Sequence, residues 1–215
     1  MKPPLPARWF FDIVSPYAYL HLKRFDELNP ALDIMPVPVL FAGLLKHFDN
    51  KGPAELAPKR LHTYRSCVFA AQQHGIPFRL PPQHPFNPLH AQRLLIALGA
   101  SRPTVEAAFN FVWAEGRDLA TEWPQFCARL GVGVEQAATM TADPAVKRQL
   151  ADNTSDAAEA GVFGVPTLSF RGQNFWGSDA IAWANSFVDN PGMFDAGEMK
   201  RAAEIGIGAA RKEAG

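Results

Sequence analysis

Cysteine is scarce in this chain, and its spacing excludes several kinds of chemistry. Cys67 and Cys127 are the only cysteines among 215 residues, and no C-x-x-C pair occurs. A dithiol redox motif, a disulfide framework or a cysteine-ligated zinc site needs more thiols or closer spacing. The six histidines form no H-x-x-x-H or H-E-x-x-H pattern, so we expect no metal site. We expect both cysteines to be buried or partly buried thiols.

The chain also lacks an excess of either charge and any long apolar run. Its 21 Lys and Arg residues balance 21 Asp and Glu residues, which argues against a dedicated binder of nucleic acid or anionic membranes. No apolar stretch approaches the roughly 20 residues that span a bilayer. The N-terminal segment contains no signal-peptide core. We therefore expect a globular cytoplasmic protein with neither nucleic acid nor membrane as a partner.

The stretch WFFDIVSPYAYL, at positions 9–20, contains the first candidate site. Five of the six residues from Trp9 to Val14 are aromatic or β-branched, which is typical of a buried strand. Ser15 and Pro16 follow, and these residue types are favoured at the N-cap and the first position of a helix. We predict a helix over residues 17–28. Ser15 either only caps this helix or also stabilises an anion at its N-terminus.

Periodicity and turn residues divide the rest of the chain into three parts. Residues 32–39 predict a second strand, parallel to the first, whose prolines favour a sheet edge. A helical block follows, with a proline-rich loop over residues 76–88. The last part predicts a hairpin and two further helices. The helices are expected at residues 58–74, 90–98, 104–115, 121–130, 134–140, 144–160, 180–188 and 195–212, and the hairpin strands at 165–170 and 174–176.

The two β-containing parts cannot fold separately, because each has too few strands. We therefore expect one mixed sheet. Residues 1–45 and 161–215 would form this α/β unit, and residues 46–160 would form an inserted helical domain.

Two motifs near the C-terminus are further candidates. In Gly164-Val165-Pro166-Thr167 a proline opens a strand. A cis Val165–Pro166 bond would expose the Val165 backbone to an extended ligand, whereas a trans bond would simply start the strand. In Gly177-Ser178-Asp179 the two polar residues either cap the following helix or hold the carboxylate and ammonium of a ligand.

These motifs together resemble a known family. SPYAYL at positions 15–20, GVFGVPT at 161–167 and FWGSD at 175–179 resemble the kappa-class glutathione transferases, a group that includes the 2-hydroxychromene-2-carboxylate isomerases. The resemblance covers essentially the whole chain. It implies an α/β thioredoxin-like fold with an inserted all-helical domain, as in DsbA, and the order of elements agrees with it. It also implies glutathione as cofactor, a small aromatic substrate and a homodimer.

The resemblance implies a role for each matching position. Ser15 would be catalytic and would activate the glutathione sulfur. Val165, before a cis proline, would pair with the cysteinyl backbone. Asn87 is expected to face the substrate. The expected glutathione-binding residues are Ser15, Pro16, Tyr17, Asn50, Lys59, Val165, Pro166, Ser178 and Asp179, although Asn50 by default suits a turn and Lys59 a solvated surface.

Three functions remain open from the sequence. The first is a glutathione-dependent isomerase of aromatic hydrocarbon catabolism. It would interconvert 2-hydroxychromene-2-carboxylate and trans-o-hydroxybenzylidenepyruvate, or a related catabolite, through transient addition of the glutathione thiolate. The second is a kappa-like glutathione transferase or peroxidase that consumes glutathione. The third is a non-enzymatic thioredoxin-like binding module, in which Ser15 is only a cap.

Overall fold

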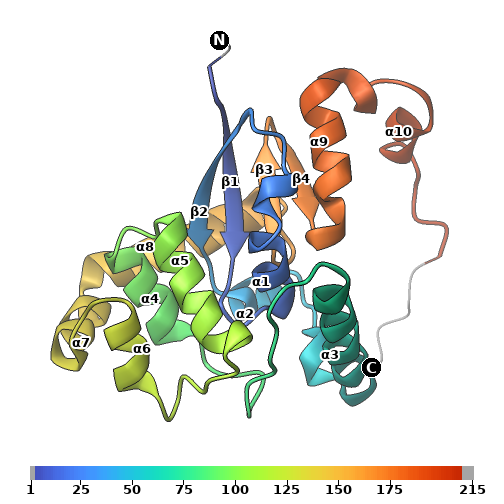
Figure 1. Ribbon diagram of the computed structural model, residues 1–215. Coiled ribbons are helices and arrows are strands. Elements are labelled where there is room, and N and C mark those ends of the chain that lie inside the picture. Colours follow the sequence, from blue (N-terminus) through green and yellow to red (C-terminus); the bar gives the residue numbers. More distant parts are fainter. Residues whose placement is uncertain (1–2, 210–215) are drawn as a thin grey trace.

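The computed structural model describes residues 3–209 and confirms the strand–helix–strand start of the chain (Figure 1). Strand β1 (Leu5–Phe11) leads to α1 (Pro16–Leu22), the short 3₁₀ turn η1 (Phe25–Glu27) and β2 (Leu32–Pro38). β2 pairs with β1 in parallel, and the sheet order is β2-β1-β3-β4. The proline-containing strand therefore lies at an edge, where a missing backbone donor is tolerated.

The predicted hairpin completes the mixed sheet. β3 (Thr167–Phe170) pairs antiparallel with β1, and β4 (Gln173–Trp176) pairs antiparallel with β3. The two-residue turn between them has positive φ at Arg171 (49°) and at Gly172 (73°). Positive φ at both central residues gives the turn a twist that matches that of the strands.

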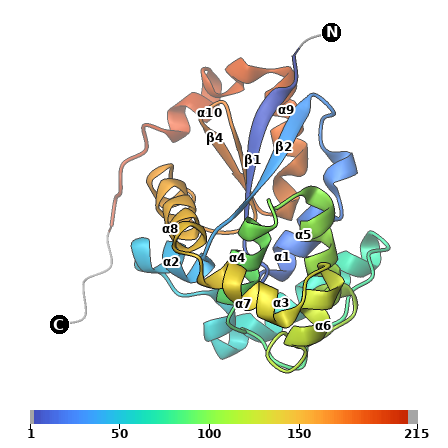
Figure 2. The same cartoon turned by 90° about the vertical axis from the view of Figure 1, so that its left-hand side faces the viewer.

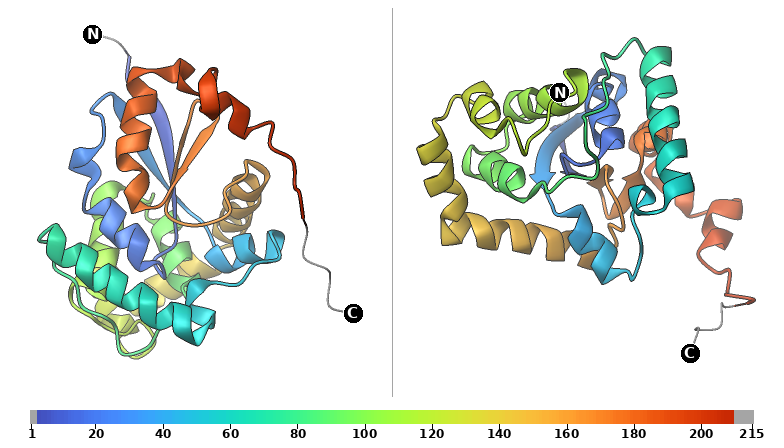
Figure 3. Two further views of the ribbon diagram at one scale, coloured as in Figure 1. Left: turned by 90° about the vertical axis from the view of Figure 1, so that its right-hand side faces the viewer. Right: turned by 90° about the horizontal axis from the view of Figure 1, so that it is seen from below.

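Helices between β2 and β3 gather at the end of the sheet where β1 ends (Figure 1). α3 lies alongside α1 (Figure 3). The predicted domain boundary after residue 45 falls inside α2. The elements of this part are α2 (Phe41–His47), η2 (Pro53–Glu55), α3 (Ala57–Gln73), α4 (Leu89–Ala97), α5 (Arg102–Phe109), the π-helical turn η3 (Asn110–Ala114), α6 (Trp123–Arg129), α7 (Val134–Ala142) and α8 (Pro144–Glu159).

The C-terminal part differs from the prediction at its end. The 3₁₀ turn η4 (Ser178–Ala180) precedes α9 (Ile181–Asp189), and η5 (Pro191–Phe194) and α10 (Gly197–Ala202) follow. The helix predicted over residues 195–212 is wrong beyond α10, since residues 205–209 are not helical and residues 210–212 lie outside the described part. Ile205 and Ile207 are 70% and 89% exposed, so no tertiary packing supports a longer helix.

Two boundaries near Ser15 also need correction. The strand predicted over residues 9–14 ends at Phe11, because the Asp12 side chain bonds the backbone of Val14 and turns the chain. The helix predicted over residues 17–28 ends at Leu22. Arg24 leaves helical geometry (φ −116°, ψ 18°), and its guanidinium forms two bonds to the Glu27 carboxylate.

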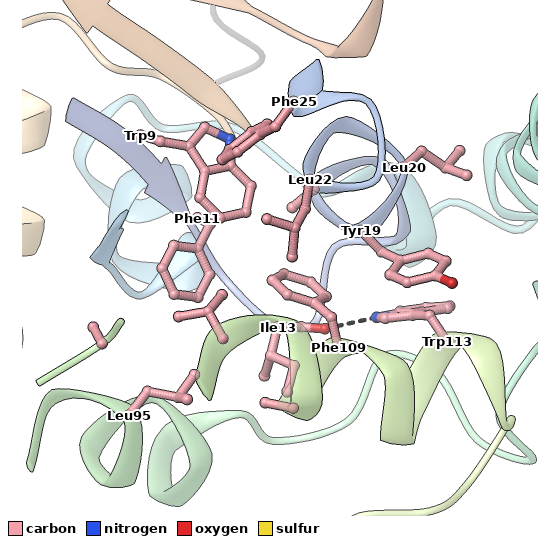
Figure 4. Packing of buried hydrophobic residues seen from close by; sticks show 14 of the residues in the cluster. Trp9, Phe11, Ile13, Tyr19, Leu20, Leu22, Phe25, Leu95, Phe109 and Trp113 are labelled. Atoms are coloured by element: carbon pink, nitrogen blue, oxygen red, sulfur yellow. Dashed lines mark hydrogen bonds between the residues drawn. The ribbon is translucent and has the colours of Figure 1, made fainter. Parts of the chain in front are cut away.

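α8 and α1 lie on opposite sides of the sheet (Figure 2). Successive side chains of a strand point to opposite faces, so the strands pack on both sides. Trp9 and Phe11 stack with ring centroids 4.7 Å apart, and Phe25 and Phe109 pack beside them (Figure 4). Phe10 faces the opposite side, where it joins a cluster with residues of α2 and α8. The main cluster continues into α4, α5 and α6, so the sheet and the inserted helices share one core.

A histidine lies buried beside this core. His21 is 1% exposed, and its Nδ1 accepts a hydrogen bond from Trp9 Nε1 at 3.2 Å. Burial lowers its pKa from 6.5 to about 3, so the imidazole is neutral in the folded protein. No helix within residues 3–209 is long and apolar enough to cross a membrane.

Candidate functional site

Ser15 caps α1, as predicted. Its Oγ accepts a hydrogen bond from Ala18 N at 3.2 Å, and Pro16 occupies the first helical position. Because the oxygen accepts this bond, the hydroxyl proton is left to donate. It points to the backbone oxygen of Val165, 3.4 Å away. This is a long bond, so the hydroxyl can turn to a better acceptor at little cost.

The Val165–Pro166 peptide bond is cis, as the resemblance implied, and the alternative of a trans bond is wrong. The loop brings Val165 beside Ser15 although 150 residues separate them. Thr167 Oγ1 donates to the Gly164 carbonyl at 2.8 Å and fixes the loop from within. The Val165 N–H has no hydrogen-bond partner among the described residues. An unpaired donor and the Ser15 hydroxyl therefore lie side by side.

The η4 turn continues this surface. Gly177 N donates to the Pro166 carbonyl at 2.9 Å, and Arg24 Nη1 donates to the Ser178 carbonyl at 3.0 Å. Gly177 has φ +92° and ψ 161°, backbone angles that essentially only glycine adopts, so the position requires glycine.

The interpretation of Ser178 and Asp179 as helix caps is wrong. The N-cap residue of α9 is Ala180, and neither polar side chain makes a hydrogen bond within residues 3–209. Ser178 is half-buried and Asp179 is exposed. Both side chains are available to a ligand.

Three side chains from other elements, two buried and one partly buried, bind the backbone that leads to Ser15. Gln92 of α4 accepts from Ile13 N at 3.4 Å and donates to the carbonyls of Phe11 (3.0 Å) and Val39 (2.7 Å). Trp113 Nε1 donates to the Ile13 carbonyl at 2.8 Å (Figure 4). The proline-rich loop supplies the third, because His84 Nε2 donates to the Val14 carbonyl at 2.8 Å.

Asp12 binds the same segment from within. Its Oδ1 accepts from Val14 N at 3.1 Å, and its Oδ2 accepts from Phe41 N, at the start of α2, at 2.9 Å. Burial raises the pKa of this carboxyl from 3.8 to about 7, against the effect of both hydrogen bonds. The only sequence signal for Asp12 was an acid inside an apolar run.

Tyr17 connects the site to α3. It belongs to α1 and is half-buried, and its hydroxyl faces Ser66, Cys67 and Thr63 of α3. Burial raises the pKa of Tyr17. Thr63 also lines an open pocket of about 410 Å³, the Lys59 pocket, with Pro53, Pro58, Lys59 and His62. Lys59 therefore lines a pocket that includes Thr63, and its contact with a ligand stays a prediction.

The two asparagines bond their own turns. Asn50 Oδ1 accepts from Lys51 N at 2.8 Å, and Asn87 Oδ1 accepts from Leu89 N at 3.0 Å at the start of α4. Both are exposed, and neither bonds the segment before Ser15. Their contacts with a ligand stay predictions. In the loop that holds Asn87, the residue that reaches this segment is His84.

The cysteines are buried and unpaired, as expected. Burial raises the pKa of Cys67 to about 12 and also raises that of Cys127, so both thiols are held in their unreactive form.

Comparison with known proteins agrees with this architecture. The model of the DsbA-like thioredoxin domain matches residues 8–188. The chain belongs to this family. Two relatives are glutathione S-transferase kappa 2 of Caenorhabditis elegans, 28% identical over 86% of this chain and 92% of the relative, and 2-hydroxychromene-2-carboxylate isomerase of Pseudomonas putida, 27% identical over 80% and 89%. A solved 2-hydroxychromene-2-carboxylate isomerase shares the DsbA-like fold, with a TM-score of 0.74, 22% identity and coverage of 94% of this chain and 100% of the other.

We predict that Gln92→Leu destabilises the DsbA-like fold by about 2–5 kcal/mol. The substitution keeps the volume but leaves two buried backbone groups, Ile13 N–H and the Val39 carbonyl, without this partner. Urea denaturation measures the change. Gln72→Leu, at an exposed position of α3, is the control and should change stability by less than about 0.5 kcal/mol. Equal effects of the two variants would contradict the role assigned to Gln92.

A second prediction concerns pH, because Asp12 and His21 oppose each other. Asp12 keeps its proton up to about pH 7 when folded but only to 3.8 when unfolded, so its contribution to stability is lost as pH rises. His21 is protonated near 6.5 when unfolded but near 3 when folded, so its contribution is lost as pH falls. Between pH 3.8 and 6.5 the two groups change the free energy of unfolding in opposite directions, so their effects partly cancel.

Each single variant should therefore show the pH dependence of the unfolding free energy that the other group causes. Relative to wild type, the unfolding free energy of Asp12→Asn should rise with pH across this window, and that of His21→Asn should fall. Each difference should reach about 1.4 kcal/mol per pH unit at most. Urea denaturation at several pH values measures both, and parallel curves for the three proteins would refute the assignment.

Proposed function

We propose that the chain is a glutathione-dependent isomerase that interconverts 2-hydroxychromene-2-carboxylate and trans-o-hydroxybenzylidenepyruvate, or a closely related aromatic pair. One observation carries the proposal. The Ser15 hydroxyl, at the N-terminus of α1, lies against the backbone of Val165 in the cis-proline loop. The names of the relatives support an enzyme and suggest this chemistry. The proposal includes a homodimer in the cytoplasm.

The residues present fit glutathione. The unpaired Val165 N–H, with its carbonyl, offers the donor and acceptor that an extended cysteinyl backbone needs. Asp179 supplies an acceptor for an ammonium group, and Ser178 supplies a donor for a carboxylate. Lys59 offers a cation in the neighbouring pocket to the other carboxylate. Each polar end of a tripeptide therefore has a complementary group.

The chain's own part in the chemistry is to hold a thiolate. Bound glutathione supplies the nucleophilic sulfur that no side chain at this site provides. Ser15 donates its hydroxyl proton to an anionic acceptor, and the Ala18 N–H fixes the oxygen while it does so. The N-terminal end of α1 adds its partial positive charge. Both interactions favour the charged form of a thiol over the neutral form and so lower its pKa.

Dithiol exchange is not available at this site. Positions 15 and 18 hold serine and alanine, and the two cysteines are buried elsewhere. Within a family of DsbA-like domains, this chain therefore needs a sulfur from its ligand.

A second candidate is a kappa-like transferase or peroxidase, favoured by relatives of that name at the same level of identity. The same serine and the same glutathione contacts serve both reactions. Product analysis separates them, because an isomerase conserves free glutathione whereas a transferase or peroxidase depletes it. A binding module without activity remains the third possibility.

We predict that Ser15→Ala binds glutathione but loses the thiolate form. Calorimetry measures binding, and ultraviolet absorbance of the bound thiolate at neutral pH measures ionisation. The control is Ser101→Ala, because Ser101 caps α5 by the same kind of bond, from Thr104 N. Both variants should lose about 1 kcal/mol of stability, but only Ser15→Ala should lose the thiolate signal.

Either of two results would count against the proposal. Absence of glutathione binding to the wild type would exclude both enzyme candidates. A normal thiolate signal in Ser15→Ala would show that Ser15 is only a cap.

A further inference from the structure

A second, smaller pocket lies beside α3 and has no part in the proposed glutathione contacts. It measures about 180 Å³ and is called here the Arg60 pocket. Arg60 and Tyr64 are one helical turn apart and share a face of α3, while Lys59, His62 and Thr63 line the larger pocket. The two pockets therefore lie on different faces of the same helix. The lining residues of the Arg60 pocket are Arg60, Tyr64, Leu80, Pro81, Pro82 and His84.

Hydrogen bonds connect this pocket to Ser15. His84 Nε2 lies 2.8 Å from the carbonyl of Val14, which is joined to Ser15 by a peptide bond. His84 Nδ1 lies 2.9 Å from the Tyr64 hydroxyl. A carbonyl only accepts, so Nε2 bears the hydrogen and Nδ1 accepts from Tyr64. The pocket therefore lies beside the backbone segment that precedes Ser15.

The charge of the pocket is positive. Arg60 forms no ion pair with an acidic side chain in the described part of the chain, and no Asp or Glu lines the pocket. Burial lowers the pKa of His84, and the Arg60 charge lowers it further. The imidazole is therefore neutral, and the guanidinium is the one charge at the pocket wall. A guanidinium without a partner favours a planar anion that accepts two parallel hydrogen bonds.

The other walls select the group attached to that anion. Leu80, Pro81 and Pro82 are apolar, and the Tyr64 ring adds an aromatic surface. At about 180 Å³, the pocket is smaller than the roughly 300–1,000 Å³ of a cleft that holds a drug-sized ligand. It suits a carboxylate with the planar group next to it, and it is too small for a whole substrate.

We propose that the Arg60 pocket binds the carboxylate end of a small aromatic acid and thereby orients the second substrate beside Ser15. This inference rests on the proposed function, because it assigns the substrate end that glutathione does not occupy. Arg60 is the specificity-determining residue, and Tyr64 and His84 form the inner wall.

The pKa of His84 should respond to an anion bound in the pocket. An anion at Arg60 offsets the guanidinium charge, so the pKa of His84 should rise on binding. The Tyr64 hydroxyl also lies 3.0 Å from the His84 carbonyl and can donate there once Nδ1 is protonated. The rings of Phe86 and Trp113 also pack against His84 and carry no charge, and Arg60 is the charged group that acts on its pKa. Arg60 is therefore the charged group through which the ligand acts on His84.

The test uses benzoate and its neutral counterpart benzamide, with no glutathione present. Calorimetry measures binding, and NMR measures the titration of His84. We expect benzoate to bind and to raise the pKa of His84, and benzamide to do neither. Arg60→Met should weaken benzoate binding at least about tenfold, the ratio that 1.4 kcal/mol represents. Arg65→Met removes the same charge from an exposed position of α3 outside the pocket and should change binding less than twofold.

A further titration with saturating glutathione separates this inference from the proposed function. Unchanged benzoate affinity supports a pocket for the second substrate, whereas competition would show that glutathione itself occupies the pocket and would overturn the inference. Absent benzoate binding, equal binding of benzamide, or equal binding by Arg60→Met would also overturn it. Failure of glutathione to bind, with benzoate binding intact, would refute the proposed function instead.

Discussion

The position of Ser15 depends on hydrogen bonds from side chains to the backbone between β1 and α1. The helix supplies partners only for the last residue of this segment, since the Ala18 and Tyr19 N–H groups donate to the Ser15 carbonyl. The N–H and carbonyl groups of Ile13 and Val14 bond side chains instead. Buried groups of this kind destabilise a fold unless something else pairs with them. Gln92, Trp113, His84 and Asp12 provide those partners. Three of these four side chains come from other parts of the chain, so the conformation of the segment depends on them as well as on Asp12.

Because of this dependence, the inserted helices and the sheet form one packed structure. Gln92, Trp113 and His84 come from α4, η3 and the proline-rich loop, all within the insertion. The aromatic cluster around Trp9 includes Phe109 of α5, so the same helices also complete the core under β1. Removal of the insertion would expose this face of the sheet and leave the approach to Ser15 unpaired. Residues 46–160 are therefore inserted in the order of the chain, but they pack with the sheet around one core.

The features that the sequence predicted well are local. Ser15 followed by Pro16 marks a helix start through interactions within one turn, and prolines in β2 place that strand at an edge through their missing donor. The residues that sequence reasoning missed act over long distances. Gln92 binds residues 79 and 81 positions away, and a single glutamine in a helix carries no motif. Ser178 and Asp179 show the same limit, because the residue types favour caps while the observed turn leaves their side chains unpaired.

A serine at position 15 has a consequence for what the site must bind. A hydroxyl whose oxygen accepts from a helix N-terminus has one proton to donate and is a poor nucleophile at its ordinary pKa. Under the proposed function, this group stabilises an anion that arrives with a ligand, and the ligand supplies the reactive atom. The zero net charge of the whole protein gives no sign of this requirement, but the first turns of α3 carry Lys59, Arg60, His62 and Arg65. Lys59 and Arg60 each line a different pocket, so in the two proposals one helix offers a separate cation to each of two acidic ligands.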